Sequence, residues 1–317
     1  MKGTRIAIIA VTAICLLLCV QIAGATSIQL NPPAVSGSQA AVSQASVSVA
    51  AASANDNYPI SEKQAKDNIR VFMGDLTLEP VLTTTGSLPI GNYYYFTEGN
   101  STFTVNQNTG IVEFAHFGDN APGSTDIVLT RDDAYTKATG YANGKVTDFS
   151  SRTWKLVVDR VDEQWEYVYN QTSNNWEEVV TQKAYDFVFR EKKDNVLLPS
   201  LVYISVNPKT GSIVDYWGVD RLNTVSSLKN TVSRSDAVKT AENYWDDADY
   251  YQSEESHLEV VIREQNVENL AWVISLTHTY SDDDTYTYVF VVDANDGSVL
   301  GTHWDNIWPL HWLRYYI

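Results

Sequence analysis

The chain has 317 residues, with 22 Lys and Arg against 39 Asp and Glu, and a formal net charge of −17. Charge of this sign repels phosphate backbones and anionic lipids, so we expect no nucleic-acid partner and no membrane contact except through an N-terminal segment. Both cysteines, Cys15 and Cys19, lie in the N-terminal apolar run, so the rest of the chain has no disulfide and no cysteine metal site.

The N-terminus has the order of an export signal. Lys2 and Arg5 precede an apolar run that ends at Val20, and small residues follow. This order predicts a signal peptide over residues 1–25, and an uncleaved N-terminal anchor is the alternative. The Ala- and Ser-rich residues 26–57 predict a disordered linker. We therefore expect an exported protein that is extracellular or held at the cell surface.

A helix-start pattern occurs three times along the rest of the chain. Each copy has an apolar residue, a Ser or Thr suited to an N-cap, and a short helical stretch. The copies are Ile60-Ser61-Glu62-Lys63-Gln64-Ala65, Leu129-Thr130-Arg131-Asp132-Asp133-Ala134 and Val232-Ser233-Arg234-Ser235-Asp236-Ala237. We expect Ser61, Thr130 and Ser233 to cap three helices.

A strand-and-turn pattern closes each of the three copies. The closings are Val105-Asn106-Gln107-Asn108-Thr109-Gly110, Val206-Asn207-Pro208-Lys209-Thr210-Gly211 and Val292-Asp293-Ala294-Asn295-Asp296-Gly297. Glycine adopts positive φ without a steric cost, so we expect Gly110, Gly211 and Gly297 to be turn glycines between two strands.

The patterns predict the following elements in chain order. The first copy has a helix from Ser61 to a stop at Gly74, then strands at Tyr93–Phe96, Ser101–Val105 and Ile111–Phe114. The second has a helix from Thr130 to Asn143-Gly144, then strands at Thr153–Val158, Gln164–Tyr169, Ala184–Phe189 and Leu201–Val206. The third has a helix from Ser233 to about Tyr244, then strands at Leu258–Arg263, Ala271–Thr277, Tyr286–Val292 and Ser298–Thr302.

These elements predict an α+β fold of tandem small modules, each with one helix packed on an antiparallel β-sheet. The expected modules are 58–118 (short), 125–218 (extended) and 230–303. An aromatic tail, 304–317, is too apolar to lie free in water. It either packs back on the last sheet, which we favour, or docks to a partner.

One helix followed by strands and a sequence close to Val-Asp-x-x-Thr-Gly-x-Val resembles the PepSY family, whose modules also occur in the propeptides of thermolysin-like secreted metallopeptidases. The third copy resembles it best, through Ser233–Ala237 and Val291–Val299, and the first copy least. The resemblance implies about three divergent PepSY-like copies and a role in binding or inhibiting peptidases. No protease domain follows in this chain, so we expect such action in trans.

Motifs for catalysis or metal binding are absent from the sequence. It has no His-Glu-x-x-His, Gly-x-Ser-x-Gly or phosphate-binding loop, and none of its five histidines lies three or four residues from another. Asp293–Gly297 places its glycine one position too early for an EF-hand calcium loop. We therefore expect no enzyme activity, no cofactor and no catalytic or metal-ligating residues. A hydrolase would need a deep pocket with convergent carboxylates or a histidine.

Aromatic residues alternate in two predicted strands, as Trp165-x-Tyr167-x-Tyr169 and Tyr286-x-Tyr288-x-Phe290. Alternation places such residues on one face of a sheet, and the simpler interpretation is that this face is core. Exposed Tyr and Trp would instead form a face that binds sugars or peptides.

Asn100-Ser101-Thr102 and Asn170-Gln171-Thr172 are N-glycosylation sequons near strand ends, which agrees with a cell-surface setting. The sequence thus favours an exported, non-enzymatic PepSY-like repeat protein that binds a protein partner in the envelope or secretome, such as a peptidase that it inhibits or regulates. The alternative is a surface module that binds glycan or cell wall through exposed aromatics. Burial or exposure of Trp165, Tyr167 and Tyr169 discriminates between these two functions.

Overall fold

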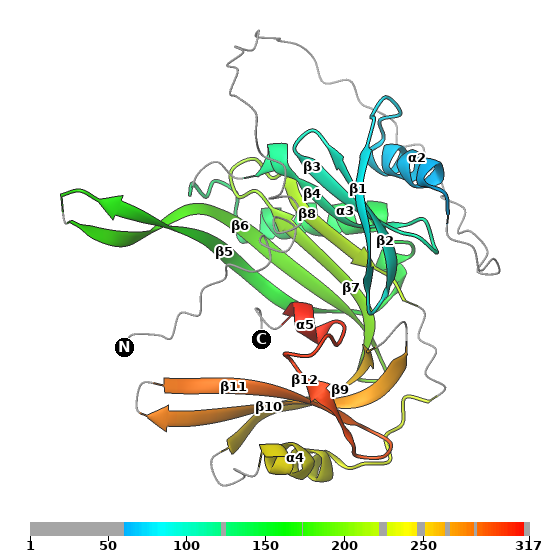
Figure 1. Cartoon of the computed structure of the whole chain (residues 1–317), viewed down its shortest axis with the longest axis vertical. Coiled ribbons are helices and arrows are strands. Elements are labelled where there is room, and N and C mark those ends of the chain that lie inside the picture. The colour runs from blue at the N-terminus through cyan, green and yellow to red at the C-terminus, as the bar shows by residue number, and fades with distance from the viewer. Residues whose placement is uncertain are drawn as a thin grey trace. The chain divides into compact units, whose positions relative to one another are not determined.

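The computed structural model describes residues 60–121, 125–172, 174–221, 227–245, 251–263, 267–281 and 284–313 (Figure 1). All of them belong to one compact unit. The signal and linker expected at residues 1–25 and 26–57 lie outside the described residues. In the described ranges, no helix is both long enough and apolar enough to cross a membrane.

The first segment comprises α2 (Glu62–Met73), β1 (Val81–Leu88), β2 (Gly91–Glu98), β3 (Ser101–Asn106) and β4 (Val112–Phe117), followed by a 3-10 turn at Gly118–Asn120. Helix α2 begins after Ser61 and ends at Gly74, which has a φ of 70°. Strand β1 was not predicted from the sequence. It is an edge strand, rich in Thr and without aromatics, whose residues alternate between exposed and half-buried.

The second segment comprises α3 (Arg131–Lys145), a 3-10 turn (Phe149–Ser151), β5 (Trp154–Asn170), β6 (Asn175–Lys193), β7 (Val196–Val206) and β8 (Ile213–Val219). The predicted helix end at Asn143-Gly144 is wrong. Helix α3 ends one residue later, at Lys145, where the backbone N–H of the buried Val146 donates to the Ala142 carbonyl and closes the last turn. The strands predicted on either side of Asp159 are one strand, since residues 159–163 stay paired with β6.

The third segment comprises α4 (Arg234–Glu242), a 3-10 turn (Asn243–Trp245), β9 (Tyr251–Ile262), β10 (Glu268–Ser281), β11 (Asp284–Asp293) and β12 (Val299–Thr302). A short helix, α5 (Leu310–Leu313), follows. The four predicted strands coincide with β9–β12, most of which extend further than predicted, and α4 ends two residues before Tyr244.

The strands of each segment pair in chain order as an antiparallel meander. The first two segments join where β4 pairs antiparallel with β8, with Phe114 opposite Trp217. Strand β7 meets β9 through one parallel pair, Leu197 with Glu259. The mixed α and β content is therefore dominated by one large sheet, where the sequence predicts tandem modules with a sheet each. The junctions use strand edges that a separate meander would leave unpaired.

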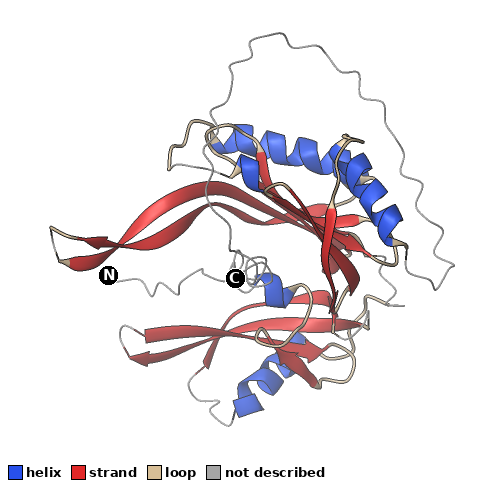
Figure 2. Cartoon of the chain, turned by 45° about the horizontal axis from the view of Figure 1, so that its top comes forward, coloured by secondary structure: helices blue, strands red, loops and turns tan. Residues whose placement is uncertain are grey.

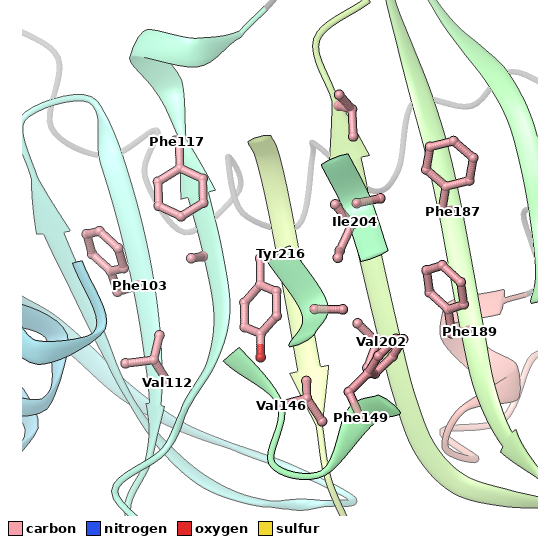
Figure 3. Packing of buried hydrophobic residues seen from close by; sticks show 14 of the residues in the cluster. Phe103, Val112, Phe117, Val146, Phe149, Phe187, Phe189, Val202, Ile204 and Tyr216 are labelled. Atoms are coloured by element: carbon pink, nitrogen blue, oxygen red, sulfur yellow. The ribbon is translucent and has the colours of Figure 1, made fainter. Parts of the chain in front are cut away.

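Helices α2 and α3 cover the same face of the joined β1–β8 sheet (Figure 2). The core beneath them runs from Phe103 and Phe117 in the first segment, past Tyr216 on β8, to Ile204 and Phe187 in the second (Figure 3). The two segments thus share one core across the β4–β8 junction.

Small residues let the helices approach the sheet closely. The fully buried helix positions include Ala65, Ala134, Ala138, Ala142, Ala237 and Ala241. A larger side chain at such a position overpacks the interface, which typically lowers the free energy of unfolding by about 1–3 kcal/mol. Because alanine is small, these helices pack closely against the sheet although they bury few large apolar side chains.

The C-terminal tail packs back on the last meander as far as it is described. Trp308 is fully buried, exchanges backbone hydrogen bonds with Ile262, and donates its indole N–H to the Pro199 carbonyl at 2.9 Å. Ile307 and Leu310 lie in the core formed by β9, β10 and β11. The favoured sequence interpretation is correct for this part of the tail, and residues 314–317 lie outside the described residues.

A buried ion pair ties the end of the second meander to the first. Arg221 makes a bidentate contact with Glu113, at 2.7 and 2.9 Å, and also donates to the Ile90 carbonyl. The Tyr93 hydroxyl donates to one oxygen of the same carboxylate at 2.6 Å and the Asn106 amide donates to the other at 3.2 Å, so each Glu113 oxygen accepts two hydrogen bonds. Such full satisfaction is what a buried charge requires.

Candidate functional site: the aromatic hairpin

The predicted cap residues lie at the starts of the three long helices. The hydroxyl oxygens of Ser61, Thr130 and Ser233 each accept a hydrogen bond from the backbone N–H three residues later. At Ser61 the Gln64 side chain also accepts from the cap backbone, which completes a capping box. These contacts satisfy donors that a helix start leaves unpaired, which is a structural task.

The three predicted turn glycines occupy equivalent turns. The side-chain oxygen of Asn106, Asn207 or Asp293 accepts from the backbone N–H groups two and three residues later. The glycine that follows donates to the backbone carbonyl of the same Asn or Asp. The φ angles of Gly110, Gly211 and Gly297 are 73°, 75° and 78°, a region that disfavours other residues.

Each turn holds the start of its own helix. The backbone N–H of the residue before the cap, Ile60, Leu129 or Val232, donates to the carbonyl of the residue after the turn Asn or Asp, at 2.7 to 2.9 Å. The side chains of Ile60, Leu129 and Val232 each lie within 4 Å of the position that a Cβ atom on the turn glycine would occupy. The helix-start pattern and the turn pattern are therefore joined by backbone hydrogen bonds into one structural unit, which occurs three times and which we call the cap-and-turn device.

The aromatic strand pattern of β5 lies on the surface, so its interpretation as core is wrong. Trp165, Tyr167 and Tyr169 are 39%, 62% and 43% exposed, and Trp176 on β6 is 62% exposed. The reason is strand length: β5 and β6 extend past the sheet as a two-stranded hairpin, with no helix against this part (Figure 1). In the second pattern Phe290 is buried as expected, whereas Tyr286 is 40% exposed.

Cross-strand register gathers these aromatics on one face. Tyr167 is opposite Glu178 and Tyr169 is opposite Trp176, so with Trp165 the face carries four aromatic side chains and a carboxylate. The rings of Tyr169 and Trp176 meet edge-to-face, 5.4 Å apart, and the Tyr167 hydroxyl donates to Glu178 at 3.2 Å. We call Trp165, Tyr167, Tyr169, Trp176 and Glu178 the aromatic face.

A polar row crosses the helix-free face of the joined sheet, and the sequence analysis did not identify it. Asp186, Ser205, Asp215 and His116 are successive cross-strand partners on β6, β7, β8 and β4. His116 Nδ1 and Asp215 Oδ1 are 2.8 Å apart, and this hydrogen bond raises the pKa of His116. No spacing in the sequence reveals the row, because its members are 19, 10 and 99 positions apart in the chain and only the strand pairing aligns them.

Asp186 is the most strongly perturbed carboxyl group of this row. Burial raises its pKa to about 8, and the negative charge of Asp162 adds to the shift. Hydrogen bonds from Ser205 and from the Tyr203 hydroxyl, the latter at 3.1 Å, oppose it. A carboxylic acid that keeps its proton near neutral pH can donate a hydrogen bond, and its charge follows the pH of the surroundings.

Other residues singled out from the sequence have ordinary roles. His257 lies 3.2 Å from Glu259, and His303 Nδ1 accepts from the Val289 backbone. Across the described ranges, no group of three or more His, Cys, Asp or Glu side chains is arranged to hold a metal ion. The sequon residue Asn100 donates to Asp119, and Asn170 donates to Glu177 near the hairpin tip.

Comparison with known proteins bears on the third segment. Residues 231–303 match the PepSY family model, described as the peptidase propeptide and YPEB domain. The matched PepSY residues run from the start of α4 to the end of β12, and they are one copy where the sequence predicts about three.

Among solved structures, the chain is similar to the Bacillus megaterium YpeB C-terminal domain, with 15% sequence identity and a TM-score of 0.39. That alignment covers 77% of this chain and 97% of the other. No curated protein matches the chain.

Proposed function

We propose that this protein is an exported, non-enzymatic protein of three PepSY-like segments that binds a protein partner through the aromatic face of the β5–β6 hairpin. The observation that carries the proposal is the exposure of four large aromatic side chains on one face of a hairpin that extends beyond the core. Tyr and Trp are enriched at the energetic centres of protein interfaces, because they bury a large area at small entropic cost.

The repeated cap-and-turn device supports the three PepSY-like segments. In the matched PepSY residues, Val232 donates to Ala294 and the turn glycine is Gly297. The first and second segments repeat the same hydrogen bonds around Gly110 and Gly211, and each pairs four strands in the same meander. The recurrence covers backbone geometry, side-chain acceptors and topology together, which supports a common origin of the segments.

The proposed partner class is a secreted peptidase or another envelope protein, acted on in trans. The PepSY description links the third segment with peptidase propeptides. The N-terminal signal pattern supports export, with release or N-terminal anchoring as the two routes. The sequons at Asn100 and Asn170 fit an extracellular setting and are proposed, on the pattern alone, as glycan sites.

The second candidate function is binding of glycan or cell wall, and exposure of Trp165, Tyr167 and Tyr169 is the observation in its favour. The ring geometry favours a protein partner instead. The rings of Tyr169 and Trp176 lie at 64° to each other, so they do not form the flat platform that stacking on a sugar ring needs. Val168 and Val179, on the opposite face, are also exposed, which gives the hairpin apolar surface on both sides.

The experiment is affinity capture from the native secretome and envelope, with residues 26–317 as bait. The control bait has a shortened hairpin, in which Gln164 joins Gln182 through Asn-Gly in the observed register. We expect a protein, with reduced peptidase activity if it is a peptidase, that the control bait does not retain. Wall material that requires Trp165 and Tyr167 would instead establish the glycan function. Equal capture by both baits would show that the hairpin does not bind the partner.

A further inference from the structure

The hairpin beyond Gln164 and Gln182 carries charge of one sign only. Its charged residues are Glu166, Glu177 and Glu178, and there is no Lys or Arg between positions 160 and 183. The nearest cations on the two strands are already engaged, Arg160 with Asp162 at 3.2 Å and Lys183 with Glu163 at 2.9 Å. Glu166 and Glu178 therefore present negative charge on a hairpin that also carries exposed aromatic rings.

The carboxylates are split between the two faces of the hairpin. Glu178 is opposite Tyr167 and lies on the aromatic face, whereas Glu166 is opposite Val179 and lies on the other face. Both glutamates are exposed, and among the described residues no Lys, Arg or His forms an ion pair with either of them. Glu178 and Glu166 are thus exposed carboxylates on opposite faces of the same hairpin, and only Glu178 lies beside the aromatic rings.

The outer edges of the hairpin are also available for pairing. Strand β6 pairs with β7 only from Tyr185 onward, and β5 has β6 as its one neighbour in the described sheet. Among the described strands, none pairs with the outer side of residues 166–169 of β5 or of residues 178–184 of β6. Such an edge accepts an extended peptide as an added strand.

These three features fit a basic partner. Aromatic rings attract ammonium and guanidinium groups through their faces, and a carboxylate next to the ring strengthens the attraction. An added strand places every second side chain on the same face as the aromatics. We infer that the aromatic face binds an extended segment of the partner protein in which Lys or Arg alternates with apolar residues. The inference rests on the proposed function and names the chemistry of its partner.

The test is fluorescence anisotropy with residues 26–317 and three labelled octapeptides: alternating Lys-Val, Ser-Val and Glu-Val. We expect the Lys-Val peptide to bind at least about tenfold more tightly than the Ser-Val peptide, with affinity falling as salt rises, because screening weakens exposed charge pairs. The Glu-Val peptide should not bind. Equal affinity for Lys-Val and Ser-Val, or no binding of Lys-Val, would overturn the inference.

Non-specific attraction to an acidic protein is controlled within the chain. Glu178→Gln and Glu166→Gln remove the same charge from opposite faces, and only Glu178→Gln should weaken Lys-Val binding, by about three- to tenfold. Tyr167→Ala should weaken it similarly, and the shortened hairpin should abolish it. Equal effects of the two glutamine variants would show general attraction and contradict the inference.

The failure of this inference is distinguishable from failure of the proposed function. If a captured partner loses binding to the shortened hairpin but is unaffected by salt and by Glu178→Gln, the partner contact stands and the basic segment is wrong. If the captured partner binds the shortened hairpin normally, the proposed function itself is wrong at this hairpin.

Discussion

Arg190 donates a hydrogen bond to Glu259 at 2.5 Å, and both side chains are almost completely buried. The pair connects β6 of the second segment with β9 of the third, next to the parallel contact of Leu197 with Glu259. Arg190 also donates to the Leu198 carbonyl at 2.8 Å. Burial raises the pKa of Glu259, but Arg190 and His257 outweigh burial and hold that pKa below its ordinary value.

Removing one partner of this pair leaves the other as an uncompensated buried charge. Glu259→Gln should therefore lower the free energy of unfolding by about 3–5 kcal/mol, measured by urea unfolding. The double variant Arg190→Met with Glu259→Leu should lose less than Glu259→Gln alone. Lys63→Gln breaks an exposed pair with Asp67 and should change stability by less than about 1 kcal/mol. A loss at Glu259→Gln no larger than at Lys63→Gln would contradict the account.

The turn glycines can be compared with a helix-end glycine that has open space around it. Gly74 and Gly211 have similar φ angles, 70° and 75°. A Cβ at Gly74 meets nothing within 4 Å, whereas one at Gly211 lies 3.0 Å from Leu129 and 2.4 Å from Lys137. Gly74→Ala should lower the free energy of unfolding by about 1–2 kcal/mol through backbone strain alone. Gly211→Ala should lower it further, and equal losses in chemical denaturation would show that the turn contact is unimportant.

Stability should fall as pH rises because of Asp186. The folded protein keeps the Asp186 proton up to about pH 8, whereas the unfolded chain releases it near its ordinary value of 3.8. Between these values the folded state binds more protons, so raising the pH favours unfolding. Asp186→Asn keeps one acceptor oxygen and resembles the neutral carboxylic acid, without a group that titrates. It should exceed the parent protein slightly at pH 5 and by a much larger margin at pH 8.5 in urea unfolding, and an equal difference at both pH values would contradict the raised pKa.

The hairpin should be dispensable for folding. Residues beyond Gln164 and Gln182 contribute no buried hydrophobic side chain to the core. The variant that joins these two glutamines through Asn-Gly should therefore fold. Its far-ultraviolet circular dichroism should match that of the parent apart from the deleted strand residues, and its free energy of unfolding should lie within about 1 kcal/mol of the parent. A larger loss would mean that the aromatic face stabilises the fold and that its exposure has no need of a partner.

Local patterns predict much of this fold. Capping at Ser61, the stop at Gly74 and the turns at Gly110, Gly211 and Gly297 depend on neighbours within a few residues, and the structure has these elements at those positions. The helix end at Asn143-Gly144 is one residue early, because the following Val146 is buried in the core and its backbone N–H closes the last turn on Ala142, which is a tertiary effect.

The candidate site was harder to predict than the fold. Alternating aromatics specify one face of a strand, but whether that face is covered depends on which element packs against it. Strand β7 pairs with β6 only from Tyr185 onward, so the hairpin extends past the rest of the sheet and Tyr167 and Trp176 stay 62% exposed. The sequence signal that was available for a separate hairpin is the absence of Lys and Arg from residues 161–182. The row through Asp186 and His116 gave no such signal.

The most direct test of the central claim is site-specific photo-crosslinking on the full chain in its native secretome. A photoreactive phenylalanine analogue replaces Tyr167 on the aromatic face, Val168 on the opposite face, or the exposed Leu76 in the first segment. We predict one protein adduct from position 167, with little from 168 and none from 76. Adducts equal at all three positions, or found at 76 alone, would contradict binding of a protein partner by the aromatic hairpin.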